Sequence, residues 1–513
     1  MIDKSVPEGE VARVASIDTS PHIRRLDLFK YLSGPRPNLH RAAVRGITLT
    51  HRQCLAAAVA LAVLSGTAAG QTLPPPSHRQ LARDIFQELI EINTAGDSGT
   101  TRAAEALAQR LTAAGFPQND VLLAGPNPKK QNLVVRLRGR GRGEPILFLA
   151  HLDVVKARRE DWSVEPFRLT ERDGYFYGRG TSDIKSEVAD LVANVIRLKR
   201  EGYVPKRDII VALTADEEGG DDNGVQWLLQ SRPQLVRAAY VINTDAGGAQ
   251  IEKGRRLRNP VQTSEKVYAT YLFEVTNPGG HSSLPTRDNA IYTLATALER
   301  LSRYEFPVRL TETTRAFFAR LGEQQTGQLG SDLRAVSRNA SDSSAVARLG
   351  GIPMYNSSMR TTCVATMLDA GHAENALPQR ARATIQCRLL PGDTPAQVHD
   401  TLVSLVGDSL VRVSVVGHPV DSPASPVSPE VMSAVTRVTG QMWPGVIVLP
   451  VMDPWSSDSK HFRVAGTPVY GISGMFYDID DVRAHGKDER VLVQSFYEGV
   501  EFMYRLMKEL AGR

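Results

Sequence analysis

The chain has 513 residues, 42% of them hydrophobic and 23% charged. This ordinary globular composition excludes wholesale disorder, a collagen-like fibre and a small disulfide scaffold, and the length predicts two to four domains of about 150 residues. Most of the net charge of +5 belongs to the first 70 residues, which hold nine basic and five acidic side chains, a net of +4. Because the remainder is almost neutral and has no apolar run of ~18–20 residues, we expect neither a nucleic-acid partner nor a stable membrane span.

The N-terminal region resembles an export signal. Arg41, Arg45 and Arg52 precede the apolar stretch CLAAAVALAVL, and the small residues of SGTAAGQ and three prolines follow it. This order is typical of a secretory signal peptide with cleavage near residues 69–71, and predicts a secreted or periplasmic protein. A buried or interfacial helix is the alternative interpretation. Because about forty residues precede a signal of this kind, we hypothesise that translation begins downstream of Met1.

Helices and strands alternate through the first part of the chain. LARDIFQELIEI and TRAAEALAQRLTAAG predict helices, and QNLVVRLRG and PILFLAHLD predict strands. The glycine-rich RGRGRGE between these strands predicts an exposed hairpin turn rather than a nucleic-acid segment. The helix IKSEVADLVANVIRLKREG and the strands DIIVALTADEE and AAYVINTD follow. This alternation predicts an α/β domain with a mainly parallel sheet.

The pattern changes near residue 264. The strand KVYATYLFEVTN, the helix NAIYTLATALERLSR, the strand pair CVATMLDA and ARATIQCRLL, the helix TPAQVHDTLVSLVGD and the strand VRVSVVG follow in order. This order predicts a split βαβ, ferredoxin-like α+β domain, with an irregular or helical insertion at 307–360. Helix–strand alternation returns from Pro423. We therefore predict an extension and signal peptide at 1–70, a catalytic domain at 75–263 and 423–513, and an inserted domain at 264–422.

Two cysteines outside the predicted signal lie in strand-like runs of the inserted domain. If the runs containing Cys363 and Cys387 are neighbours, a disulfide can form in an oxidising compartment. Two buried free thiols are the alternative interpretation.

Acidic and imidazole side chains recur where predicted strands end. ILFLA leads into His151 and Asp153, IIVALTA leads into Asp216–Glu218, and YVINT leads into Asp245. The carboxyl ends of strands in an α/β sheet open onto the ligand crevice. Neighbouring buried carboxylates cost several kcal/mol unless a cation compensates their charge. Each motif alone could be a surface pair or a helix cap, but their joint occurrence predicts a site for a pair of divalent metal ions.

The motifs AHLDVV, GRGTSDIK, TADEEGG, NTDAGG, NPGGHSS and RAHGKDE, within residues 80–510, resemble those of a known enzyme family. This family is the di-zinc metallopeptidases that include aminoacylase, acetylornithine deacetylase, succinyl-diaminopimelate desuccinylase and glutamate carboxypeptidase. The resemblance implies two divalent ions, zinc in the family, and an inserted lid that also mediates homodimerisation. It implies that Asp183 bridges the ions, with the remaining ligands supplied to the first ion by His151 and Asp245 and to the second by Glu218 and His485.

The resemblance also assigns the chemistry around the ions. Glu217 is the general base and later the acid, and the Asp153 carboxylate fixes the tautomer of His151. The resemblance implies that His281 donates a hydrogen bond to the oxyanion. In the family this residue reaches the site across a dimer or on domain closure. Asn375 and Arg388 lie where the family binds the substrate carboxylate. The stretches WSSDSKHF and GISGMF are expected to line the pocket.

These assignments predict a metal-dependent hydrolase of an amide bond next to a free C-terminal carboxylate. Carboxypeptidase, dipeptidase and N-acyl-amino-acid hydrolase activities all fit, so the expected substrate is a small peptide or an N-acyl amino acid. A di-zinc aminopeptidase is one alternative, which the inserted domain with His281 and Arg388 disfavours. A non-catalytic binding module on a peptidase scaffold is the other, which the retention of five ligands and Glu217 disfavours.

Overall fold

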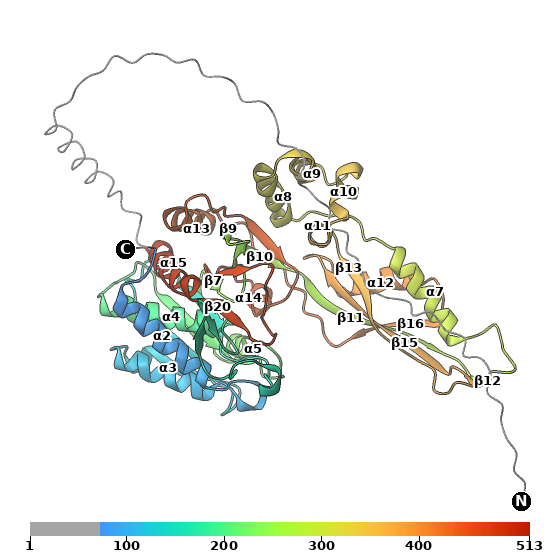
Figure 1. Ribbon diagram of the computed structural model, residues 1–513, viewed down its shortest axis with the longest axis horizontal. Coiled ribbons are helices and arrows are strands. Elements are labelled where there is room, and N and C mark those ends of the chain that lie inside the picture. The colour runs from blue at the N-terminus through green and yellow to red at the C-terminus, as the bar shows by residue number, and fades with distance from the viewer. Residues whose placement is uncertain (1–71, 513) are drawn as a thin grey trace, which may run out of the picture. The chain divides into compact units, whose positions relative to one another are not determined.

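The computed structural model describes residues 72–512. The predicted signal peptide and start site lie outside these residues. Between residues 72 and 512, no helix combines the length and the apolar character needed to cross a bilayer. The described part is built around two large sheets, which Figure 1 shows with their helices.

The first sheet has eight strands in the order β1-β2-β6-β3-β7-β18-β10-β17. The neighbours β6, β3, β7 and β18 run parallel, whereas β1, β2 and β6 pair antiparallel, as do β18 and β10. The α/β prediction is confirmed, with a parallel centre and antiparallel pairs beside it. The strand bounds are β1 Val121–Ala124, β2 Asn132–Leu137, β3 Ile146–His151, β6 Ile209–Thr214, β7 Tyr240–Asn243, β10 Val261–Glu265, β17 Pro450–Asp453 and β18 Val469–Gly471.

Helices cover both faces of this sheet, which explains why its central strands are continuously apolar. Every residue of β3 and β6 is buried. One face packs against α2 Pro76–Glu91, α3 Thr101–Ala113, α4 Lys185–Arg200, α13 Pro429–Met442 and α15 Val493–Ala511. The other packs against α5 Gly224–Ser231, α6 Pro233–Val236 and α14 Ser459–Val464.

The predicted hairpin between β2 and β3 is wrong, because β6 lies between these two strands. The largely apolar β6 is buried at every residue, which requires a place in the sheet interior, where it pairs with β2 on one side and β3 on the other. The glycine-rich connection instead runs beside the segment that leads into β6. There the main-chain amides of Arg140 and Arg142 donate to the carbonyl oxygens of Pro205 and Lys206.

The second sheet belongs to the segment between β10 and α13. Its four antiparallel strands lie in the order β13-β15-β11-β16, with bounds β11 Val267–Thr276, β13 Thr362–Ala370, β15 Arg380–Leu389 and β16 Val411–Val416. The helices α7 Ala290–Arg303 and α12 Pro395–Val406 cover one face of it. Cys363 and Cys387 face each other across β13 and β15 and form a disulfide.

The segment 307–360 forms four helices with an apolar cluster of their own. They are α8 Glu312–Gln324, α9 Gly327–Arg338, α10 Ser343–Gly350 and α11 Pro353–Met359. Phe317, Phe318 and Leu333 lie in this cluster, which also contacts Leu449 and Val451 at β17. The insertion therefore packs against the edge strand of the catalytic sheet.

Three small sheets complete the fold. They are β4 Thr170–Arg172 with β5 Tyr175–Tyr177 and β20 Arg490–Leu492; β8 Ala249–Glu252 with β9 Arg255–Arg258 and β19 Phe476–Asp478; and β12 Gly280–His281 with β14 Ala376–Leu377.

Candidate active site

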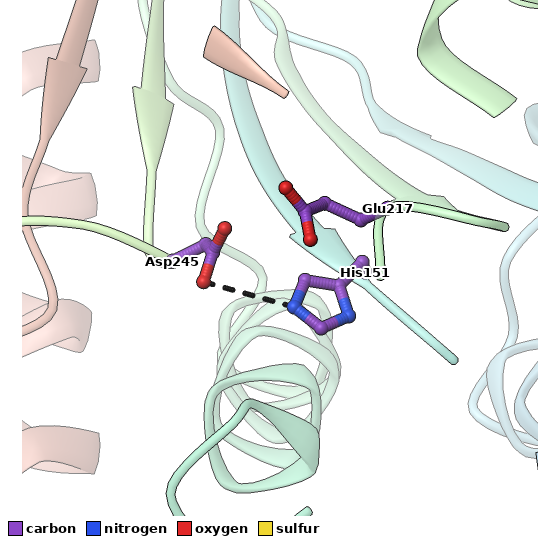
Figure 2. A group of neighbouring side chains, drawn as sticks. All are labelled: His151, Glu217 and Asp245. Carbon is purple, nitrogen blue, oxygen red and sulfur yellow. Dashed lines mark ion pairs between the residues drawn. The ribbon is translucent and has the colours of Figure 1, made fainter. Parts of the chain in front are cut away.

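Three neighbouring strands end at the same level and bring three predicted site residues together. His151 is the last residue of β3 and pairs with Thr214, the last residue of β6, while β7 lies on the other side of β3. The loops that follow carry Glu217 and Asp245 to the same edge of the sheet, as Figure 2 shows. One potential ligand atom from each of His151, Glu217 and Asp245 lies within 4.8 Å of the others.

Asp183 uses its two carboxylate oxygens toward two different histidines. Its Oδ1 lies 3.2 Å from Nε2 of His151, and its Oδ2 lies 3.1 Å from Nε2 of His485. Asp245 Oδ1 approaches Nε2 of His151 at 3.6 Å, and Glu218 Oε2 approaches Nε2 of His485 at 2.8 Å. The side chains therefore form two groups that share Asp183. Imidazole nitrogens and carboxylate oxygens in such groups fit a pair of divalent ions.

The main chain orients His151 for this task. Its Nδ1 donates to the carbonyl oxygen of Asp153 at 3.0 Å, while the Asp153 carboxylate lies 3.7 Å away. A carbonyl only accepts hydrogen bonds, so Nδ1 carries the proton of the neutral ring and Nε2 keeps a lone pair for a metal. The nearer contact that fixes this tautomer is the Asp153 carbonyl, and the carboxylate to which the resemblance assigns the task lies farther from Nδ1.

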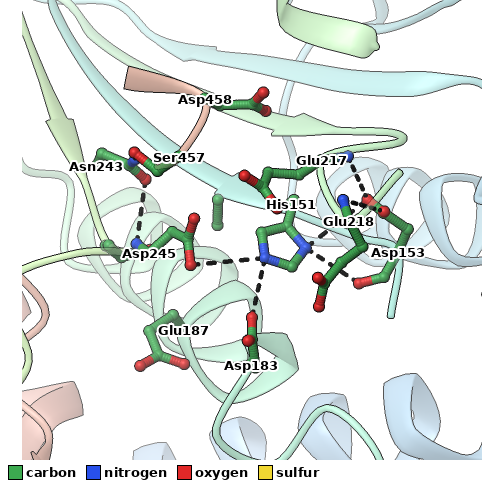
Figure 3. A network of polar contacts seen from close by, with 12 residues as sticks. His151, Asp153, Asp183, Glu187, Glu217, Glu218, Asn243, Asp245, Ser457 and Asp458 are labelled. Carbon is green, nitrogen blue, oxygen red and sulfur yellow. Dashed lines mark hydrogen bonds and ion pairs between the residues drawn. The ribbon is translucent and has the colours of Figure 1, made fainter. Parts of the chain in front are cut away.

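The Asp153 carboxylate instead holds the turn that carries the predicted base. It accepts hydrogen bonds from the main-chain amides of Glu217 at 3.2 Å and Glu218 at 3.0 Å, as Figure 3 shows. The preceding residue, Asp216, has a left-handed backbone with φ of 55°. Both glutamates therefore lie on a turn beyond the end of β6, where strand alternation no longer sends their side chains to opposite faces.

Crowding of the carboxylates perturbs their ionisation. Burial, reinforced by the charge of Asp245, raises the pKa of Glu217 well above its ordinary value. Burial also raises the pKa of Asp245 to about 7, although the hydrogen bond with His151 opposes this. Hydrogen bonds to Asp183 and Glu218 raise the pKa of His485 to about 10. Divalent ions would supply the missing positive charge and displace the imidazole proton, so the donor set fits the predicted metals.

Sequence reasoning missed a buried ion pair that joins the two ligand-bearing loops. Glu489 is fully buried and accepts the main-chain amides of Ser182 at 2.7 Å and Asp183 at 3.0 Å. Its partner Arg179 donates to the carbonyl oxygen of His485 at 3.2 Å. The pair therefore positions both Asp183 and His485. The charged residues inside GRGTSDIK and RAHGKDE were the available signal, since each lies close to a predicted ligand.

The site opens onto a cavity of about 530 Å³. Asp183, Glu217, Glu218, Asp245 and His485 lie on its wall. The expected pocket stretches contribute too, through Trp455 and Ser456 of WSSDSKHF and Ser473 and Phe476 of GISGMF. Much of the remaining wall is apolar, and its members include Ile184, Ala246, Ala249, Pro260, Val451, Tyr477, Ile479, Val482, Val491 and Leu492.

Three predicted residues of the inserted domain do not line this cavity. His281 lies on β12, paired with Ala376, and its Nδ1 contacts the hydroxyl of Ser283 at 2.7 Å. Asn375 lies beside it, with its carbonyl oxygen accepting the amide of Ser282 at 3.0 Å. The Arg388 guanidinium lies 4.6 Å from the centre of the Tyr268 ring. The structure does not bring His281, Asn375 and Arg388 to the ligand cluster.

Comparison with known proteins places this architecture in a family. Residues 147–509 match Peptidase family M20/M25/M40. The chain is 29% identical over 453 residues to N-fatty-acyl-amino acid synthase/hydrolase PM20D1.1 of Danio rerio, covering 84% of this chain and 86% of that protein.

Solved structures share the fold. An M20 family metallo-carboxypeptidase from Sulfolobus solfataricus superposes with a TM-score of 0.62 at 16% identity, over 84% of this chain and 99% of that one. A dinuclear metal binding peptidase of the M20 family from Bacillus subtilis gives 0.55 at 10% identity, over 84% and 98%. The chain therefore belongs to Peptidase family M20/M25/M40 and is a metal-dependent hydrolase of that family.

Proposed function

We propose that the enzyme hydrolyses the amide bond of N-acyl amino acids, and of small peptides with a free C-terminal carboxylate. The observation that carries this proposal is the position of Glu217, beside His151 and Asp245 on the wall of a largely apolar cavity. A long acyl chain is the substrate part that gains most from such a wall, at roughly 25 cal/mol per Å² of apolar surface buried. The name of the Danio rerio relative supports the same substrate class.

We infer that two divalent ions, zinc by resemblance, complete the site. The proposed ligands of one ion are His151, Asp245 and Asp183, and those of the other are Asp183, Glu218 and His485. The name of the Bacillus subtilis structure, a dinuclear metal binding peptidase, supports two ions rather than one. When bound, such ions acidify a water molecule and polarise the substrate carbonyl.

The protein's own contribution to the reaction centres on Glu217. Its carboxylate accepts a proton from the attacking water and returns it to the leaving nitrogen, which needs a pKa nearer neutrality than an ordinary glutamate has. Burial raises the pKa of Glu217 in that direction. Asp153 keeps the base in place through the amides of Glu217 and Glu218. The apolar wall limits the access of bulk water to the reacting groups.

We propose that the inserted domain completes the site on closure or from a second copy of the chain. His281, Asn375 and Arg388 would then serve the oxyanion and the substrate carboxylate. A homodimer through this domain is supported by β13, an edge strand of its sheet. Its Val364, Met367 and Leu368 are exposed, and an exposed apolar edge of this kind favours strand pairing with another chain.

We also propose that the enzyme is exported. The disulfide between Cys363 and Cys387 supports this proposal, because such bonds persist in oxidising compartments. Sequencing the N-terminus of the mature protein tests it, with a start near residues 69–71 expected and an intact Met1 as the contradicting result.

A substrate panel tests the proposed activity. Purified enzyme loaded with zinc is given N-acyl amino acids, dipeptides, and dipeptides with a blocked carboxyl group. We expect turnover of the first two classes and its loss with a chelator. Turnover that requires a free amino group and tolerates the blocked carboxyl would instead identify an aminopeptidase.

A pair of variants tests the base. Glu217→Gln removes the proton acceptor while nearly preserving shape, so turnover should fall by about 100- to 10,000-fold with bound metal retained. Glu105→Gln, an exposed position on α3, is the matched control and should leave turnover unchanged. Unchanged turnover in Glu217→Gln would refute the assignment of the base.

A further inference from the structure

The proposed substrates bring a carboxylate into a cavity with few groups to receive it. Transferring a charged carboxylate from water to an apolar environment is strongly unfavourable unless a cation or several hydrogen bonds compensate. Arg388 does not line the cavity. The cavity wall itself must therefore be searched for a cation with unused donors.

Three cationic side chains line the cavity among the described residues, namely Arg483, His485 and Arg490. His485 is held by two of the proposed metal ligands. Arg490 is also committed, because its Nε and Nη2 donate to Asp481 at 3.1 and 2.6 Å and its Nη1 donates to the hydroxyl of Tyr177 at 2.8 Å. Only Arg483 remains to meet an anionic group within this cavity.

Arg483 is anchored at one end and open at the other. Its Nε donates to Asp481 at 2.8 Å, and its Nη1 makes a long contact of 3.4 Å with the carbonyl oxygen of Asp488. In the described part of the chain its Nη2 has no hydrogen-bond partner, and the side chain keeps 32% of its surface exposed. The hydrogen bond from Nε restricts the orientation of the guanidinium. Its outer edge, formed by Nη1 and Nη2, is the edge that can bind a carboxylate through two hydrogen bonds.

The local charge balance also favours an anion at this place. Arg483 and Arg490 share the single carboxylate of Asp481, which leaves one positive charge uncompensated within the group. An anionic ligand at Arg483 therefore balances the remaining positive charge and does not have to displace Asp481 from an ion pair.

Arg483 lines the same cavity as the proposed metal ligands Asp183, Glu218 and His485. It precedes His485 by two residues, so the two Cα atoms lie within about 7 Å of each other. In an N-acyl amino acid, the nitrogen and the α carbon alone separate the carboxyl carbon from the scissile carbonyl. One molecule can therefore present its carbonyl to the proposed metal site and its carboxylate to this arginine.

We propose that Arg483 binds the free carboxylate of the substrate from the wall of the catalytic cavity. This inference rests on the proposed function and adds a contact in the catalytic domain that does not depend on closure of the inserted domain. Arg388 would add to the same recognition when the inserted domain closes.

A pair of substrates tests the proposal. An N-acyl leucine and its C-terminal primary amide differ only in the carboxylate, and kcat and KM are measured for both. Arg483→Ala should lower kcat/KM for the acid by about 10- to 100-fold, mainly through KM, and should change the value for the amide little. Arg483→Lys keeps the charge without the paired edge and should recover part of the loss. Arg320→Ala, an exposed arginine on α8, is the matched control.

If the amide turns over too slowly to be measured, substrate binding to the inactive Glu217→Gln variant is measured instead. The dissociation constants of acid and amide are measured with Glu217→Gln, with and without Arg483→Ala. Equal weakening of acid and amide, or an unchanged acid beside a strong effect of Arg388→Ala, would overturn the proposal. Absence of any wild-type turnover of N-acyl amino acids would instead overturn the proposed function, so the two failures are distinguishable.

Discussion

Substituting Glu489 by glutamine tests the ion pair between Arg179 and Glu489, which joins the loops that carry Asp183 and His485. The carboxylate accepts the amides of Ser182 and Asp183 through Oε1 and pairs with Arg179 through Oε2. Whichever way the glutamine amide turns, its NH₂ group faces either the guanidinium or the two main-chain amides. One set of buried donors then loses its acceptor, and Arg179, only 2% exposed, keeps its charge without a carboxylate partner, although it still donates to the carbonyl oxygen of His485.

The expected loss follows from this geometry. Removing one partner of a buried ion pair typically costs about 3–5 kcal/mol of stability. The same change weakens the support of the Asp183 amide directly and that of the His485 carbonyl through Arg179, and loss of such a supporting contact typically weakens metal binding by about 10- to 100-fold.

Chemical denaturation of the metal-free protein and competition with a chelator measure the two effects separately. Glu105→Gln again supplies the control. A loss of stability below about 1 kcal/mol together with unchanged metal affinity would refute the reasoning.

Two further predictions concern stability. His78 is buried and donates through Nε2 to Asn194 at 3.0 Å, and burial lowers its pKa to about 4. In the unfolded chain the imidazole binds its second proton near pH 6.5, so the unfolding free energy should fall by about 3 kcal/mol as pH drops from 6.5 to 4. His78→Gln should flatten that part of the profile of unfolding free energy against pH. An unaltered profile would contradict the assignment. The disulfide spans a sequence separation of 24 residues and should contribute about 3 kcal/mol. Reductant should therefore destabilise the wild type but not the Cys363→Ser, Cys387→Ser double variant, and equal sensitivity would contradict the bond.

The convergence of the site could be predicted because it follows from strand direction. Once ILFLA, IIVALTA and YVINT are parallel neighbours, the residues after them must meet at one edge. The positions of His151, Glu217 and Asp245 therefore followed from local pattern, whereas the role of each residue, and the grouping of Asp183 and His485 with them, came from the resemblance.

The parts that sequence did not predict depend on long-range pairing. Arg179 and Glu489 are 310 residues apart, and although each lies close to a predicted ligand, the sequence around them does not indicate that they pair with each other. The placement of β6 between β2 and β3 likewise required knowledge of which strand is buried on both sides. Resemblance assigned the Asp153 carboxylate to His151, whereas the main-chain carbonyl of the same residue makes the closer contact, and side-chain motifs do not reveal main-chain hydrogen bonds.

Metal stoichiometry tests the central claim most directly. Elemental analysis by mass spectrometry is applied to zinc-loaded, desalted wild type and to Asp183→Ala, whose two oxygens face His151 and His485. The account predicts two ions per wild-type chain and fewer than one in the variant, because the shared ligand supports both positions. One ion or none in the wild type, or two retained in Asp183→Ala, would contradict it.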